Sequence, residues 1–255
     1  MPTIDAHDPG TICWIDLAST DADGAAGFYC DLFGWTAAEP IEDAGGYRML
    51  LCGGKQVAGV APCWGDTDRS AWSTYVATAD ADAACAAALA SGGEVVMEAM
   101  DVLAAGRMAI LRDPAGAQVS VWQPGEHRGY ELHREPGAPI GSDLMTRDLR
   151  QAAAFYRAVF GWTAQEAAFD GGAYTVWKCR EQLVGGAVEM DETWPADTPP
   201  HWMVTIATAD ADGAARRCAH LGGSVRQPPT DIGPGRAALL GDPAGAAFAV
   251  IAVRP

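Results

Sequence analysis

The sequence predicts an α+β protein made of two homologous halves, each holding two strand–helix–strand–strand–strand modules. Three blocks recur in the same order along the chain of 255 residues. FYCDLFGW at 28–35 is matched by FYRAVFGW at 155–162, and WSTYVATADAD at 72–82 by WMVTIATADAD at 202–212. RDPAGA at 112–117 is matched by GDPAGA at 241–246. Blocks that repeat at a nearly constant spacing indicate the duplication of one structural unit.

The repeat divides the chain into a first domain at 10–124, a linker at 125–137 and a second domain at 138–253. The segment between the halves is polar, is rich in glycine and proline, and has no sustained hydrophobic period. Such a composition is typical of a linker. We expect two βαβββ modules in each domain.

Each module begins with a run of β-forming residues, followed by an aspartate that suits the start of a helix. These four aspartates are Asp21, Asp80, Asp148 and Asp210. Alanine-rich helices are predicted at 22–33 and 81–91, and glycines then stop them. Further strands follow at 47–52, 57–61, 94–97, 108–111 and 119–122. The D-P-A-G sequences at 113–116 and 242–245 predict hairpin turns, so the sheets should be mixed and largely antiparallel.

The F-Y-x-x-x-F-G-W blocks, the helix-start aspartates and the late D-P-x-G turns resemble the glyoxalase / bleomycin-resistance / extradiol-dioxygenase superfamily. The resemblance covers nearly the whole chain outside the linker, and two tandem halves of this size are similar to actinobacterial glyoxalase-like proteins. It implies that paired modules curve into two incomplete barrels that hold small molecules or metals. Whether the modules pair within a half or across the halves stays open.

The resemblance also implies where a metal would bind, because metal-using relatives take His, Glu or Gln ligands from the first and last strands of a module. Counting from the helix-start and turn aspartates selects these positions: Trp14, Thr74, Gly141, Val204, Ser120 and Ala249. None offers a strong ligand for a divalent ion. None of the five histidines recurs at its repeat mate. We therefore expect no metal and no cofactor.

Two carboxylates occupy matched positions of the two halves, at Asp16 and Asp143. Residues i and i+2 of a strand share a face, so Asp16 should lie beside Trp14 and Asp143 beside Gly141. Asp16 and Asp143 are the candidates for a general base or hydrogen-bond acceptor, and a structural role is the alternative.

Bulky aromatic side chains break the symmetry between the halves, because Trp14, Trp122 and Trp177 have Gly141, Ile251 and Leu50 as their mates. The pattern suggests that one barrel is filled while the other stays open. The candidate ligand-binding residues are Trp14, Asp16, Tyr47, Gln118, Ser120, Trp122, Asp143, Met145, Tyr174 and Trp177.

Composition excludes several classes of partner. The net charge of −16 disfavours nucleic acid and anionic membranes. No apolar run is long enough to cross a bilayer and no signal peptide is recognised, so we expect a cytoplasmic location. The seven cysteines lack C-x-x-C spacing and are expected to be reduced thiols.

The sequence thus favours a metal-independent protein that binds a small, partly apolar or aromatic organic molecule between paired modules, and the surplus of acidic residues would favour a cationic one. Such a protein would be an accessory or resistance protein of natural-product metabolism, either a monomer or a homodimer. A glyoxalase-like lyase or isomerase, or a hydroxylase-type tailoring enzyme, is the alternative. A partner-binding module with degenerate barrels is a further one.

Overall fold

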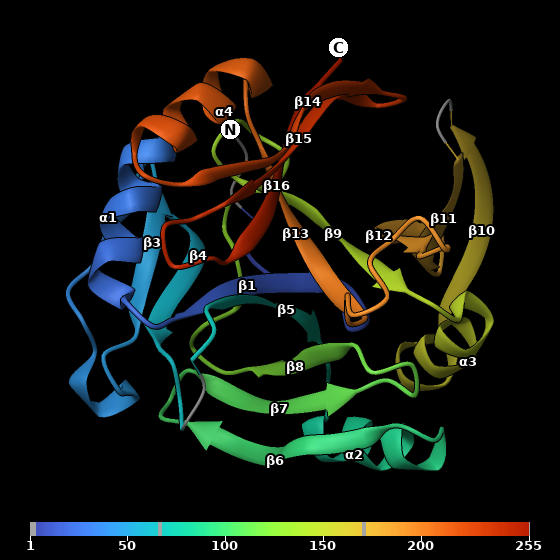
Figure 1. Cartoon of the computed structure of the whole chain (residues 1–255). Coiled ribbons are helices and arrows are strands. Elements are labelled where there is room, and N and C mark those ends of the chain that lie inside the picture. The colour runs from blue at the N-terminus through green and yellow to red at the C-terminus, as the bar shows by residue number, and fades with distance from the viewer. Residues whose placement is uncertain (1–3, 66–67, 170–171, 255) are drawn as a thin grey trace.

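The computed structural model describes residues 4–65, 68–169 and 172–254. Within these ranges the chain forms two eight-stranded sheets, and the helices lie at the outside of the molecule (Figure 1). The predicted α+β class with tandem modules is confirmed.

Both halves run through the same order of elements, strand, helix and three strands, twice. The first half contains β1 (Ile12–Ser19), α1 (Ala22–Phe33), β2 (Thr36–Ala37), a 3₁₀ turn (Glu42–Ala44), β3 (Arg48–Cys52), β4 (Lys55–Pro62), β5 (Ala71–Ala77), α2 (Ala81–Ala90), β6 (Glu94–Val102), β7 (Gly106–Arg112) and β8 (Gln118–Pro124). The second half contains β9 (Pro139–Thr146), α3 (Leu149–Phe160), β10 (Trp162–Phe169), β11 (Gly172–Cys179), β12 (Gln182–Glu189), β13 (His201–Ala207), α4 (Ala211–His220), β14 (Ser224–Ile232), β15 (Gly235–Gly241) and β16 (Ala247–Val253).

The two modules of each half join through their first strands. The first sheet has the order β2-β3-β4-β1-β5-β8-β7-β6, and the second has β10-β11-β12-β9-β13-β16-β15-β14. β1 runs antiparallel to β5 and parallel to β4, and β9 has the same relation to β13 and β12. Neither sheet closes into a barrel, because its two outermost strands do not pair with each other. The pairing that the sequence left open is therefore within each half.

The helices begin where the aspartates predict. The side chains of Asp21, Asp80, Asp148 and Asp210 each accept a hydrogen bond from the backbone N–H three residues later. This contact satisfies one of the N–H groups left free at a helix start. Among the helices that the structure describes, none combines the length and the apolar character needed to cross a membrane.

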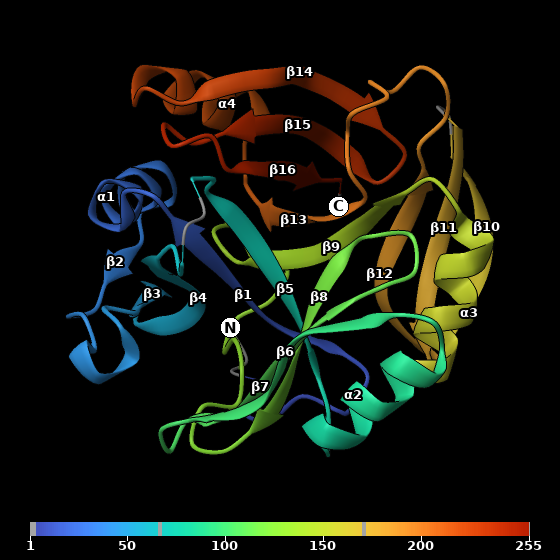
Figure 2. The same cartoon turned by 60° about the horizontal axis from the view of Figure 1, so that its bottom comes forward.

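The hydrophobic core crosses the boundary between the halves. Helix α1 lies beside α4, and α2 lies beside α3 (Figures 1 and 2). Each of the two buried clusters accordingly contains residues from both halves. Tyr29 of α1, for example, packs edge-on against Phe248 of β16 with the ring centroids 5.3 Å apart. The two sheets are thus held together by shared packing and not only by the connecting segment.

Two buried tyrosines reinforce this boundary with hydrogen bonds. Tyr156 donates to Asp113 Oδ2 over 3.0 Å, and Tyr29 donates to Asp242 Oδ2 over 3.2 Å. Each aspartate also holds its own D-P-A-G turn: Oδ1 of Asp113 accepts three backbone N–H groups, and Oδ1 of Asp242 accepts that of Ala246. The repeated tyrosine and aspartate of the sequence blocks therefore tie each half to the other.

The segment 125–137 between the halves is attached to the first sheet. Tyr130 is 4% exposed and donates its hydroxyl to the carbonyl of Ile12 over 2.7 Å. The N–H of Tyr130 bonds to the carbonyl of Cys13, and Glu131 exchanges hydrogen bonds with Gln56 of β4. The middle of this segment therefore has a fixed place against β1 and β4.

Candidate functional site

Each sheet has one face that carries the predicted carboxylate, which we call the inner face. In the first sheet the inner face carries Trp14, Asp16 and Tyr75, and in the second it carries Gly141, Asp143 and Thr205. Strand register brings these residues together: Trp14 pairs with Tyr75, and Tyr75 with Ser120 of β8. The placement of both aspartates beside residues 14 and 141 agrees with the strand alternation.

One residue count from the sequence was wrong. Counting back from the helix starts selected Thr74 and Val204, but both are buried on the outer face, where Thr74 donates to Ser142 Oγ over 2.9 Å. Tyr75 and Thr205 occupy the inner face instead. Trp14 and Gly141 lie seven residues before their helix-start aspartates, whereas Tyr75 and Thr205 lie five residues before theirs, so a fixed number of residues does not select equivalent positions in successive modules.

Asp16 is the centre of a hydrogen-bond network on the first inner face. Its Oδ2 accepts the hydroxyl of Tyr75 over 2.8 Å and, more weakly, that of Tyr47 over 3.5 Å. Tyr47 in turn accepts the indole N–H of Trp14 over 2.7 Å. Burial raises the pKa of Asp16 to about 6, although the hydrogen bonds oppose this rise. The carboxyl group can therefore exchange a proton close to neutral pH.

Aromatic side chains fill the space beside this network. Trp14 and Trp122 are only 3% and 6% exposed, and both contact His127 from the segment between the halves. The rings of Trp14 and His127 meet edge to face with centroids 4.4 Å apart. Burial lowers the pKa of His127 to about 4, so its imidazole is neutral at physiological pH. Sequence reasoning missed His127, because it has no repeat mate and lies 113 residues from Trp14.

The second inner face carries a simpler version of the same centre. Asp143 Oδ1 accepts the hydroxyl of Tyr174 over 2.6 Å, and the carboxylate also accepts the N–H of Gly186. Burial raises the pKa of Asp143. Tyr174 lies over Gly186 as Tyr47 lies over Gly59, so closely that a Cβ at either glycine would collide with the tyrosine hydroxyl.

Small residues replace the aromatic ones on the second face. Gly141 pairs with Thr205, and Thr205 with Ala249, which places the three in one row across β9, β13 and β16. The same row of the first sheet is Trp14, Tyr75 and Ser120. A Cβ built on Gly141 would meet no atom within 4 Å, so the space above this glycine is open.

The remaining predicted residues lie in different places. Ser120 is buried beside Tyr75, and Met145 is half-buried on the inner face, two residues beyond Asp143. Gln118 is exposed at the start of β8. Trp177 does not reach either inner face: it is completely buried, with its ring 5.9 Å from that of Tyr156. It packs in the core as its repeat mate Leu50 does.

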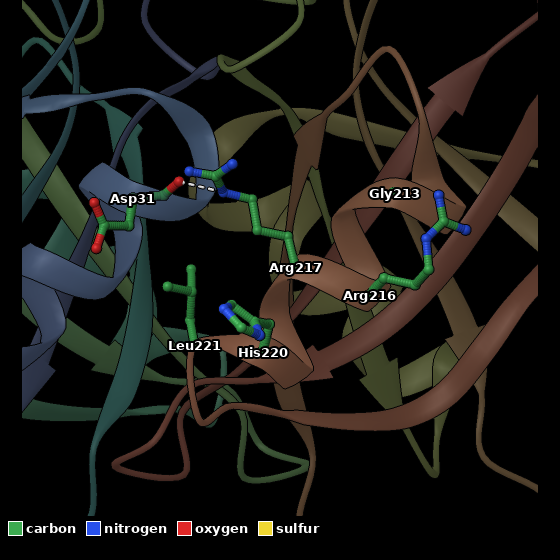
Figure 3. Close-up of a pocket in the computed structure, with 6 residues that line it drawn as sticks. All are labelled: Asp31, Gly213, Arg216, Arg217, His220 and Leu221. Atoms are coloured by element: carbon green, nitrogen blue, oxygen red, sulfur yellow. Dashed lines mark hydrogen bonds between the residues drawn. The ribbon is translucent and has the colours of Figure 1, made fainter.

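A hollow of about 670 Å³ lies elsewhere, between α1 and α4 (Figure 3). Its volume would suit a small ligand, but it is open to solvent, and charged side chains such as Arg216 line it. Arg217 crosses it and donates to the carbonyl of Asp31 (Figure 3). It contains none of the predicted site residues, so we place the candidate site on the inner faces.

Comparison with known proteins identifies the family. The family model of the Glyoxalase/Bleomycin resistance protein/Dioxygenase superfamily matches residues 11–121 and again 138–250. The chain belongs to this superfamily. Both matches coincide with a complete eight-stranded sheet, apart from its last residues.

Relatives within the superfamily match over nearly their whole length. The "Anthracycline biosynthesis protein DauV" of Streptomyces sp. (strain C5) is 39% identical over 261 residues, which cover 96% of this chain and 94% of the relative. The "Putative glyoxylase CFP32" of Mycobacterium bovis is 39% identical over 262 residues, covering 100% and 99%.

Solved structures of the superfamily share the fold at low identity. A 2,3-dioxygenase, LapB, from Pseudomonas sp. KL28 has a TM-score of 0.66 at 16% identity, covering 94% of this chain and 91% of its own. The Mn(II)-bound glyoxalase from Novosphingobium aromaticivorans has a TM-score of 0.65 at 16% identity, covering 96% and 83%. At this identity the likeness shows the fold alone.

Because one superfamily structure holds Mn(II), the donor set of this chain has to be tested for a metal. The row of the first sheet offers an indole, a phenol and a hydroxyl, and the row of the second offers a glycine, a threonine and an alanine. Within the described ranges, no three His, Cys, Asp or Glu side chains form a group that could hold a metal ion. A divalent ion needs several such donors, so the residues do not fit one.

Proposed function

We propose that this protein binds a small, partly apolar or aromatic organic molecule without a metal ion, as an accessory or resistance protein of natural-product metabolism. The binding site is the inner face of the second sheet. The observation that carries the proposal is the open space above Gly141, two residues before the half-buried Asp143.

The surroundings of Gly141 support a ligand of this kind. Met145, Met203 and Ile251 offer apolar surface, whereas Asp143 and Thr205 offer a few polar groups. Organic ligands bind in surroundings of this composition, where the polar groups fix the orientation. Methionine side chains adapt to irregular ligand shapes. The 39% identity to a protein named for anthracycline biosynthesis supports the natural-product context.

Calorimetric titration of the full-length protein tests the proposal. The protein is first treated with a chelator, its metal content is measured, and a panel of planar aromatic natural products is titrated into it. We expect at least one ligand with a dissociation constant of about 1–100 µM and a stoichiometry of one. Adding Mn²⁺, Zn²⁺ or Fe²⁺ should leave that constant unchanged.

A matched pair of tryptophan variants locates the site. Gly141→Trp should fill the open space and weaken binding at least tenfold, because the indole would occupy the position of the ligand. Gly27→Trp is the control, since Gly27 is exposed on α1 and a Cβ there also meets no atom within 4 Å. A silent panel, a metal requirement, or equal losses in both variants would overturn the proposal.

One observation favours an enzyme as a second candidate. Asp16 titrates near pH 6 and contacts two tyrosine hydroxyls, which suits a general acid or base. A glyoxalase-like lyase or isomerase would use it to move a proton on a 2-oxoaldehyde adduct. Turnover of 2-oxoaldehydes with and without added thiol tests this. Loss of turnover in Asp16→Asn with retention in Asp143→Asn would support it, and absence of turnover would exclude it for these substrates.

A further inference from the structure

The two inner faces differ at one pair of neighbouring positions in a way that describes the ligand. In the first sheet this pair is Trp14 and Tyr75, which face each other across β1 and β5. In the second sheet the equivalent pair is Gly141 and Thr205, which face each other across β9 and β13. Two aromatic side chains on the first inner face therefore have no aromatic counterpart on the second.

In the first half these two groups complete the site. Trp14 is only 3% exposed, and its indole ring packs against His127. The phenol of Tyr75 donates its proton to Asp16 Oδ2 over 2.8 Å. A phenolic hydroxyl thus bonds to the carboxylate, and a fused two-ring system lies on the same face beside it; both come from the protein itself.

The second half retains the carboxylate but neither of these two aromatic side chains. Asp143 keeps the tyrosine contact of the first half, from Tyr174, as Asp16 keeps that of Tyr47. Thr205 replaces Tyr75, and within the described residues no side chain of β13 donates to Asp143. A hydrogen bond donated to an ionised carboxylate is stronger than one between neutral groups. A ligand hydroxyl in the place of the Tyr75 hydroxyl would therefore gain a favourable contact.

We infer that the ligand of the second half is a planar aromatic molecule of at least two fused rings, which carries a phenolic hydroxyl and donates that proton to Asp143. Its rings occupy the space that Trp14 fills in the first half, and its hydroxyl takes the place of that of Tyr75. The inference rests on the proposed function and names its ligand class. Because the first half is closed by its own side chains, one molecule binds per chain.

Two probes of nearly equal shape test the hydroxyl. 2-Naphthol and 2-methoxynaphthalene are titrated separately into the full-length protein by calorimetry. We expect 2-naphthol to bind about tenfold more tightly, because only its hydroxyl can donate a charge-assisted hydrogen bond. Asp143→Asn should reduce this preference to less than about threefold, since it removes the charged acceptor. Equal affinities for both probes in the wild-type protein would overturn the hydroxyl assignment.

Filling variants test the position. Thr205→Tyr recreates the Tyr75 arrangement and should abolish binding of 2-naphthol, whereas Thr163→Tyr on the exposed strand β10 should leave it unchanged. Unchanged binding in Thr205→Tyr would overturn the assignment of the site. The outcome is separable from the proposed function: if the natural-product panel binds and loses affinity in Gly141→Trp, that function stands even where the two naphthalenes bind equally.

A gain of binding gives the reverse test. The double variant Trp14→Gly with Tyr75→Thr copies the pair Gly141 and Thr205 into the first sheet and should raise the stoichiometry for 2-naphthol from one to two. Circular dichroism and a cooperative melt establish that the variant is folded. A folded variant that still binds one molecule would overturn the equivalence of the two faces. If the variant does not fold, the result with Thr205→Tyr decides the inference.

Discussion

Replacing Tyr156 by phenylalanine removes one hydroxyl that joins the two halves of the molecule. This hydroxyl accepts the indole N–H of Trp202 over 2.9 Å and donates to Asp113 over 3.0 Å. All three side chains are buried, and Tyr156 has no exposed surface. Phenylalanine fits the same space, so the substitution removes hydrogen bonds and leaves the packing of the ring unchanged.

The expected loss of stability follows from the two bonds. A hydrogen bond to a carboxylate contributes about 1.5–3 kcal/mol, and a buried N–H without an acceptor costs about 1–3 kcal/mol. Asp113 keeps its three backbone N–H contacts, so its own loss should be at the lower end. We therefore expect the free energy of unfolding to fall by about 2.5–4.5 kcal/mol. For a chain of this size that is a fall of about 5–18 °C in Tm.

Urea unfolding followed by circular dichroism measures this change, and calorimetry measures Tm. Tyr29→Phe should give a similar loss, because Tyr29 makes the equivalent contacts with Trp72 and Asp242. A double-mutant cycle of Tyr156→Phe with Asp113→Asn should show a coupling free energy of about 1 kcal/mol or more. A loss below about 0.5 kcal/mol, or no coupling, would refute the view that this contact joins the halves.

Three further predictions concern single residues. Burial raises the pKa of Asp16 from 3.8 to about 6, so the folded state binds the proton more tightly and stability should fall as pH rises across this interval. Asp16→Asn should reduce that slope in urea titrations, although Asp143, whose pKa is also raised by burial, still contributes to it; an unchanged slope contradicts the prediction. Gly186→Ala should cost about 1–3 kcal/mol by displacing Tyr174, while Gly27→Ala should cost nothing. Asp148→Ala should lower Tm through the loss of about 1 kcal/mol of helix capping.

The sequence was sufficient to predict the modules, because their signals are local. The four helix-start aspartates bond to backbone N–H groups a few residues away, and the D-P-A-G turns join strands that are neighbours in the chain. The repeat then doubles each signal at a known spacing. The position of Asp16 on the face of Trp14 was equally accessible, since strand alternation depends only on adjacent residues.

Contacts between distant segments could not be predicted in the same way. No periodic pattern indicates that His127 packs on Trp14, or that Tyr156 reaches the turn at Asp113. The misplacement of Thr74 has a different cause, because the inner-face residue lies seven positions before the helix-start aspartate in the first module and five positions before it in the second. Trp177 shows that a residue which breaks the repeat can do so in the core, where its mate Leu50 is also fully buried.

Tyr29 and Tyr156 each bond to the opposite half, and this mutual attachment has a consequence for the evolution of the protein. Two separate copies of a half would carry the same residue at position 14 and at its mate, so any tryptophan there would fill both faces at once. Fusion of the copies into one polypeptide removes that constraint while keeping the mutual attachment through Tyr29 and Tyr156. One copy can then become a rigid support, and the other remains free to accept new molecules.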